Sequence, residues 1–412
     1  MRLKALLIPI ILLVSFSLYA QTDQSQLPYS VSGTVIDAET GRPLQFVGVS
    51  FTGMRYATVT NSDGAFTLKS ATEPETVDFS LLGYKTVRMV FPKDGTPLKV
   101  KMPKGDLTLD GALVIADPYS VLQRAIARIK DNYPKQPELF DCFYRETVQK
   151  KNRYVYVSEA VSRMYKSSYF RGGIYADRIA VDKSRIIESS AKRDTLSVKV
   201  VGGPVQAVIL DIVKNDDLLT AEELSNYALE MDLPAIIGDR LQFAIKLIPI
   251  NATPYPLYEG VIYIDRETFA FTRFDLNYDM RDKEKVAQSI LVSKPAGLRF
   301  TPTQVSIRYD YSLSEGISRV SYVRSVMRFK CDWRKRLFRS EYTAVSELVT
   351  TDRHSGDIEQ ISRKESFGGR EVLSELAAEN YDPEFWKDYN IIEPSESLDK
   401  AIVRIVRKTD RN

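Results

Sequence analysis

Short stretches in which apolar and polar residues alternate fill the chain from residue 30 to residue 115. The candidate strands, separated by turn residues, are 31–36, 47–51, 58–60, 65–68, 77–82, 87–91 and 98–102. Asp63-Gly64 lies between two of them, and this dipeptide is typical of hairpin turns because glycine accepts the positive φ that such turns require. Short strands at this spacing predict a small seven-stranded β-sandwich over residues 30–115.

The same stretch carries an ordered motif of glycine, polar and apolar positions. The motif consists of Gly33-Thr34-Val35, Asp37, Thr40-Gly41, Pro43-Leu44, Val47, Val49, Thr60, Asp63-Gly64, Phe66 and Leu82-Gly83-Tyr84. In these residues the chain resembles the carboxypeptidase-regulatory-like domain, a transthyretin-like β-sandwich. The resemblance implies an accessory module of the Gram-negative envelope, and it implies no peptidase activity.

Residues 109–115 resemble the segment that often follows this domain in TonB-dependent receptors, where a plug and a 22-stranded barrel come next. In the present chain 296 of the 412 residues follow Ala116. Twenty-two strands of about 10 residues would use about 220 of them, and the remainder cannot supply both the connections and a plug. The chain is therefore not expected to be such a receptor, and residues 107–115 are expected to close the sandwich and link it onward.

Residues 117–350 are predicted to form a larger antiparallel β domain that begins with a helix. Asp117-Pro118 opens this helix, 118–131, in which apolar residues recur every three or four positions. Residues 139–165 and several later stretches then alternate with period 2, which indicates an antiparallel sheet with one solvated face. A polar insertion separates the two groups of strands and contains short helices, the first of them at 205–213.

The hairpin at 258–271 resembles part of the periplasmic half-barrel lipoprotein carriers, which hold an acyl chain in the concave face of a curved sheet. If this sheet curves, the residues expected to line its concave side are Phe243, Ile245, Val305, Ile307, Tyr309, Met327 and Phe329. Alternatively, helix 118–131 and the C-terminal tail fill this face and give an ordinary core. A small outer-membrane barrel is a further alternative, which the inserted helices and the charged C-terminus disfavour.

The two ends of the chain differ from the rest. Residues 1–20 have a short basic start, an apolar run and a final alanine, which is the pattern of a secretory signal peptide. The run is shorter than the roughly 20 residues that span a bilayer. We therefore expect an exported protein of the periplasm, free or associated with the outer membrane. Residues 355–412 are predicted to be a polar linker and a helical tail.

Composition limits the chemistry that this chain can perform. The net charge is +3, and two of the positive charges lie in the predicted signal peptide, so nothing indicates nucleic-acid binding. His354 is the only histidine, which excludes a site with several histidine ligands, and its polar neighbours predict a turn. The chain has no phosphate-binding loop, dinucleotide fingerprint or serine-hydrolase motif. The sequence thus predicts no enzyme, no cofactor and no metal.

The sequence contains two cysteines, Cys142 and Cys331. By their position along the predicted strands both point to the apolar side of the sheet. An oxidising envelope permits a disulfide between them, and two buried thiols are the alternative.

Three functional classes follow from these patterns. The leading hypothesis is a non-enzymatic adaptor or scaffold of the envelope, in which the sandwich docks a protein partner. The second is a carrier or sensor that binds an apolar ligand in the curved sheet, and the third is an enzyme.

Overall fold

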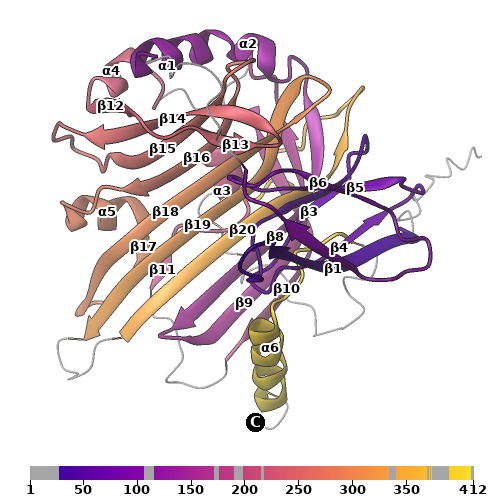
Figure 1. The fold of residues 1–412 in the computed structure, drawn as a ribbon. Coiled ribbons are helices and arrows are strands. Elements are labelled where there is room, and N and C mark those ends of the chain that lie inside the picture. The colour runs from indigo at the N-terminus through magenta and orange to yellow at the C-terminus, as the bar shows by residue number, and fades with distance from the viewer. Residues whose placement is uncertain are drawn as a thin grey trace, which may run out of the picture.

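The computed structural model describes residues 27–105, 116–170, 176–189, 198–214, 218–333, 340–368, 371, 373 and 389–409. The fold is mainly β, with an N-terminal sandwich followed by a larger open antiparallel sheet, as predicted (Figure 1). The predicted signal peptide and residues 109–115 lie outside the described residues, and the predicted domain boundaries stay predictions.

Seven strands form the sandwich, in one sheet of three and one sheet of four. The first sheet has the order β4 (Ala65–Ser70), β1 (Tyr29–Asp37), β7 (Leu98–Met102), and the second has the order β3 (Ala57–Val59), β2 (Gly48–Phe51), β5 (Thr76–Ser80), β6 (Val87–Val90). Alternate side chains along the strands point between the two sheets, where Val35, Phe66 and Phe79 form part of a closed core. This alternation is the signal that the sequence carries.

Two motif glycines hold the turns of the sandwich. Gly64, in the turn before β4, has a φ of 71°, and a Cβ atom there would lie 2.4 Å from the carbonyl oxygen of Val35. Gly83, between β5 and β6, has a φ of 82°, and its amide donates to the carbonyl of Ile236 in the large sheet. Both positions need glycine because residues with a Cβ are strained at positive φ.

The large sheet has 11 antiparallel strands. Their order is β10 (Arg178–Glu188), β9 (Arg153–Lys166), β8 (Glu138–Lys150), β20 (Ser340–His354), β19 (Ile317–Trp333), β18 (Leu298–Ser314), β16 (Phe271–Tyr278), β15 (Tyr258–Asp265), β14 (Arg240–Pro249) and β12 (Tyr227–Met231), with β13 (Ala235–Ile237) also paired to β14. The end strands β10 and β12 do not pair with each other, so the sheet is open. The alternative of a closed sheet therefore does not apply.

One face of this sheet, here called the inner face, carries Ile245, Phe274 and Tyr309, and helices pack against it. The helices of the described residues are α1 (Pro118–Ala127), α2 (Ile129–Asn132), α3 (Gln206–Ile209), α4 (Ala221–Leu224), α5 (Lys283–Ile290) and α6 (Glu396–Thr409), and β11 (Lys199–Val200) pairs with β17 (Leu291–Ser293) beside them. The predicted helix 118–131 is present as α1 and α2, and the Asp117 carboxylate caps it by accepting from the amide of Ser120 at 2.8 Å. None of the described helices is long and apolar enough to cross a membrane.

Two local predictions were wrong. Residues 178–188, taken as part of the polar insertion, form the edge strand β10, whose Arg185 is paired with a carboxylate of β9. His354, expected in a turn, is the last residue of β20 and pairs across to Leu139. In both cases charged side chains concealed a strand, because their partners come from a neighbouring strand that the local sequence does not contain.

The sandwich lies against the opposite, outer face of the large sheet. Val59 packs there with Phe143, Val161 and Val349. Residues 389–396, here called the strap, run between the sandwich and the sheet before entering α6 (Figure 1). Asn390 makes two hydrogen bonds to the backbone of Lys69. The tail therefore ties the N-terminal unit to the sheet.

Candidate functional site: a cleft between the sandwich and the sheet

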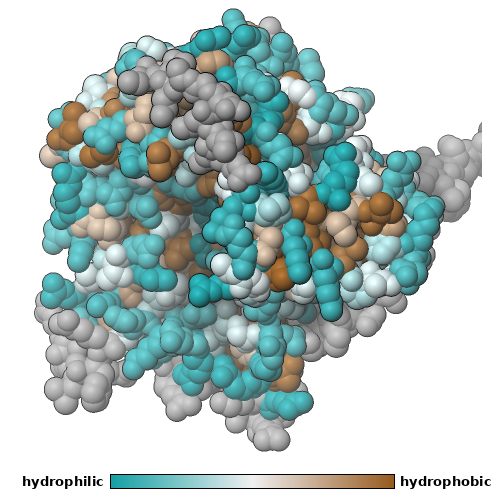
Figure 2. Space-filling model, viewed as in Figure 1, coloured by the Kyte–Doolittle hydropathy of each residue, from teal (hydrophilic) through white to brown (hydrophobic). Residues whose placement is uncertain are grey.

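A cleft of about 540 Å³ lies between the sandwich and the outer face of the large sheet. One wall comes from β2, β3 and β5, and the other comes mainly from β14, β16, β18 and β19. The face of the molecule seen in Figure 2 includes the sandwich and is largely hydrophilic. The cleft volume is within the usual range of binding sites, which is roughly 300–1,000 Å³.

Arginines held by carboxylates line the sheet wall of the cleft. Arg240 makes two bonds to the carboxylate of Asp265, at 2.5 and 2.7 Å. On β16 and β18, Arg273 and Arg308 both bind Asp310, at 2.7 Å each. Although burial would raise the pKa of Asp310, the charges of the two arginines lower it. These guanidinium groups are fixed in place and charged, so the wall presents preorganised hydrogen-bond donors.

Phe46 lines the cleft and connects the sandwich to the large sheet. Its ring lies 5.9 Å from the ring of Tyr322, and the guanidinium groups of Arg324 and Arg308 lie 4.9 and 5.5 Å from its centroid. Phe46 has a φ of 62°, which is unfavourable for a residue with a side chain. The packing between the two units therefore stabilises a strained backbone at this contact.

The rim of the cleft carries a second group of charges, at the end of β8 and β20. Arg55 of the sandwich lies 3.1 Å from Asp352. His354 Nε2 lies 2.9 Å from Asp141 Oδ2. Burial is the main reason why the pKa of Asp352 is raised. The rim thus joins side chains of the sandwich and of two sheet strands.

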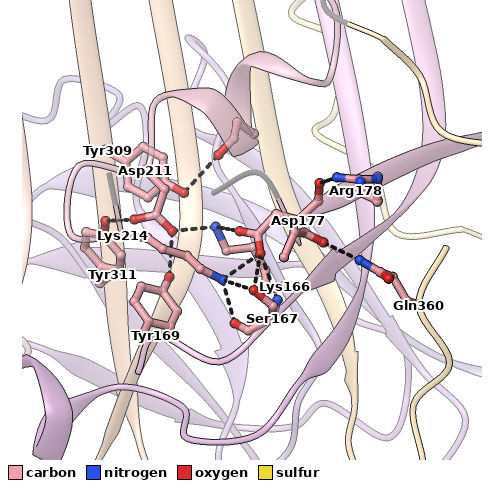
Figure 3. Close-up of polar contacts among 12 residues, drawn as sticks. Lys166, Ser167, Tyr169, Asp177, Arg178, Asp211, Lys214, Tyr309, Tyr311 and Gln360 are labelled. Carbon is pink, nitrogen blue, oxygen red and sulfur yellow. Dashed lines mark hydrogen bonds and ion pairs between the residues drawn. The ribbon is translucent and has the colours of Figure 1, made fainter. Parts of the chain in front are cut away.

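A different polar group is buried under the inserted segment on the inner face (Figure 3). Lys166 binds both Asp211, at 2.5 Å, and Asp177, at 2.8 Å. Lys214 binds Asp177 at 2.6 Å. The hydroxyl of Tyr311 on β18 donates to Asp211 at 2.5 Å. All four charged side chains are at most 3% exposed, and two lysines balance two aspartates.

The electrostatics of this buried group point to a structural role. Burial and the charge of Lys166 lower the pKa of Lys214 to about 8. Lys214 Nζ nevertheless donates to three oxygens, the carbonyl and hydroxyl of Ser167 and the carboxylate of Asp177. A lysine that activates a serine must offer it a free lone pair. Lys214 instead has the contacts of an ammonium ion that clamps the inserted segment to the sheet.

The seven residues predicted to line an apolar concave face lie among the packed side chains of the inner side. Ile245 and Tyr309 are fully buried in the core that α1 and α3 help to form, and Phe243 packs against its edge. Val305, Met327 and Phe329 are buried in a second cluster with α5. Ile307 is also buried. Whether this face takes up an apolar ligand stays a prediction.

Cys142 and Cys331 are both free and buried, so the structure contains no disulfide between them. The register gives the reason. Cys142 lies opposite Thr350 of β20, whereas Cys331 lies opposite Ser340 of the same strand, ten residues away. Ten residues of strand span about 33 Å, far beyond the reach of a disulfide. The alternative of two buried thiols describes the structure.

The sequence interpretation did not single out the arginines of the cleft as candidate site residues. Arg273 and Arg308 meet at one carboxylate because β16 and β18 pair in a particular register. Their only sequence signal is a charged residue on the polar side of each strand, which is what any solvated face shows. The motif residue Asp63 also has an unforeseen role, because its carboxylate accepts from the amide of Glu396 at the start of α6.

Comparison with known protein families identifies the first unit. Residues 31–114 match the CarboxypepD_reg-like domain. The CarboxypepD_reg-like domain covers the sandwich and the segment after it, and it forms one wall of the cleft. The rest of the chain lies beyond this match. A comparison with curated proteins finds no match.

Three solved structures show weak likeness to the chain. A putative outer membrane lipoprotein-sorting protein domain from Vibrio parahaemolyticus is 10% identical, with a TM-score of 0.25, and the likeness covers 58% of this chain and 93% of that one. A DUF1329 family protein from Desulfovibrio piger is 12% identical, with a TM-score of 0.24 and coverage of 57% and 94%. MucB is 13% identical, with a TM-score of 0.19 and coverage of 57% and 98%.

Proposed function

We propose that this protein is an exported, non-enzymatic adaptor of the cell envelope that binds a protein partner in the cleft beside its CarboxypepD_reg-like domain. The observation that carries the proposal is the cleft itself, whose walls come from two units fixed to one another. Export follows from the signal peptide predicted at residues 1–20.

The lining of the cleft combines apolar side chains with fixed charged and polar groups, a mixture that suits a polypeptide segment. Arg240, Arg273 and Arg308 are each held by a carboxylate, and residues of β2 and β5 line the opposite wall of the cleft. Such a surface offers hydrogen bonds in fixed directions, which suit the backbone and polar side chains of a protein segment.

The other functional classes have less support. The inner face that a carrier would use is packed against the chain's own helices. The titratable side chains around Lys214 are the best candidates for acid–base chemistry, but they are buried and their positive and negative charges balance. An adaptor requires neither an empty apolar face nor a reactive base.

Photo-crosslinking in the native envelope tests the proposal. A benzophenone amino acid placed at Thr52 or Ser314, both of which line the cleft, should crosslink to the same envelope protein. The matched controls are Tyr119 and Val292, which are 49% and 47% exposed and lie outside the cleft. They should not capture that protein.

A charge variant gives an independent test of the same site. Arg88 lines the cleft with a side chain that is 60% exposed, so Arg88→Ala should reduce the crosslink yield without unfolding the protein. Arg128→Ala, at a position that is 51% exposed and outside the cleft, should leave the yield unchanged. Crosslinks from the controls but not from the cleft positions, or retention of the protein in the cytoplasm, would overturn the proposal.

A further inference from the structure

Three side chains that suit a divalent cation meet at the rim of the cleft. They are Asp141 of β8 and Asp352 and His354 of β20, each partly exposed. One potential ligand atom from each lies within 4.8 Å of the others, and within the part of the chain that the structure describes this is the one group of its kind. The chain places its only histidine beside two carboxylates.

The strand register explains why these residues converge. Asp352 lies directly opposite Asp141 across the β8–β20 pair, and a bulge between Thr350 and Asp352 shifts the register just before this point. Like charges directly opposite each other destabilise a strand pair. On the other side of Asp141 lies Arg163, and this arginine already binds Asp182 at 2.8 Å. The facing carboxylates thus form a locally acidic position on the sheet.

Asp141 and Asp352 each use only one carboxylate oxygen in the side-chain contacts described here. The hydrogen bond and the ion pair of Asp352, to the amide of Arg353 and to Arg55, both use Oδ1. The contact between Asp141 and His354 uses Oδ2 of the aspartate. Asp352 Oδ2 and Asp141 Oδ1 take no part in these contacts, so a cation can bind at Asp352 without displacing Arg55.

We propose that Asp141, Asp352 and His354 form a binding site for a divalent transition-metal ion such as Zn²⁺. An imidazole nitrogen with two carboxylates is a ligand set that Zn²⁺ accepts and that Ca²⁺ and Mg²⁺, which prefer oxygen ligands alone, do not favour. The 2.9 Å between His354 Nε2 and Asp141 Oδ2 is a hydrogen-bond distance. Zn²⁺ binding would replace this hydrogen bond and move the two side chains only slightly, because tetrahedral ligands about 2.05 Å from the metal are about 3.3 Å apart. The site is independent of the partner proposed for the cleft.

The single histidine makes a direct experiment possible. The mature chain, purified without a histidine tag and labelled at histidine, gives imidazole NMR signals from His354 alone. Titration with ZnCl₂ should shift these signals with one-to-one stoichiometry, and calorimetry on the same sample should give the same stoichiometry. His354→Ala and Asp141→Asn should each weaken binding by more than about tenfold.

Two matched variants separate the site from general electrostatics. Glu39→Gln removes an exposed carboxylate of the sandwich and should leave Zn²⁺ binding unchanged, whereas Arg55→Ala removes a nearby positive charge and should strengthen binding a few-fold. Zn²⁺ should also raise the unfolding temperature of the parent protein and not that of folded His354→Ala. Zinc binding that persists in His354→Ala, or imidazole signals that do not move at millimolar Zn²⁺, would overturn the proposal.

Discussion

Asp37 illustrates how single residues of the sandwich motif carry structure. Its carboxylate accepts from the amides of Glu39 and Thr40, at 2.9 and 2.7 Å, and from the hydroxyl of Tyr84 at 2.7 Å. It therefore joins the turn after β1 to the Leu-Gly-Tyr end of the motif, 47 residues away. The hydrogen bonds from Thr40 and Tyr84 are the main reason why the pKa of Asp37 is lowered to about 2.

This lowered pKa predicts a pH-dependent loss of stability. A carboxyl group whose folded pKa is about 2, against an ordinary value of 3.8, stabilises the fold fully above pH 3.8 and loses this contribution as the pH falls toward 2. Asp37→Asn should therefore unfold at lower urea than the parent at pH 6, and the difference should shrink between pH 4 and pH 2.

Glu39→Gln is the control for this prediction. Glu39 is an exposed neighbour whose partner is Lys104, at 3.0 Å, and an exposed pair contributes little. The variant should follow the parent at every pH. If Asp37→Asn and the parent show the same pH dependence, the Asp37 hydrogen bonds do not stabilise the fold.

At the scale of elements, the inserted segment around α3 owes its position to a buried charge network. Asp211 and Lys214 come from the insertion, Lys166 ends β9 and Asp177 precedes β10. Salt bridges at such low exposure recover their desolvation cost only when every charge is paired. The network therefore fixes where the insertion lies on the inner face more than it adds net stability.

Removing one charge from this network should be costly. Lys214→Met leaves two buried aspartates facing Lys166 alone, and the loss of unfolding free energy should be about 3–5 kcal/mol. The double variant Lys214→Met/Asp177→Asn restores the balance of charges and should lose much less than the sum of the two single variants. Urea unfolding of the four proteins measures the coupling. Additive losses would show that the two side chains act independently.

At the scale of the whole molecule, the strap makes two units behave as one. The side chain of Asn390 makes hydrogen bonds to both the amide and the carbonyl of Lys69, as a neighbouring strand would. Ile392 packs with Val59 and Phe143. Helix α6 then packs against Val157 and Ile187 of the large sheet. Removing these residues would expose apolar surface on both units. The cleft depends on this docking because its walls belong to different units.

Deleting the strap and α6 should therefore separate the two units thermodynamically. A chain that ends at residue 388 should unfold in two transitions. A chain that ends at residue 409 keeps the strap and α6 and should unfold in a single transition. Differential scanning calorimetry distinguishes the two cases. A single transition in the shorter chain would mean that the direct sandwich–sheet contact, around Phe46, suffices.

The sequence by itself determined the sandwich, the antiparallel character of the second sheet, helix 118–131 and the amphipathic tail helix. Each of these depends on periodicity and turn chemistry within a few residues, and burial of one face selects the pattern. Tertiary structure alone decided that the inner face is filled, that Cys142 and Cys331 lie far apart, and that His354 meets Asp141, 213 residues earlier in the chain. These outcomes depend on which strands pair and in what register. A one-residue shift in register would move a whole strand's side chains to the other face, and no local stretch of sequence records the partner.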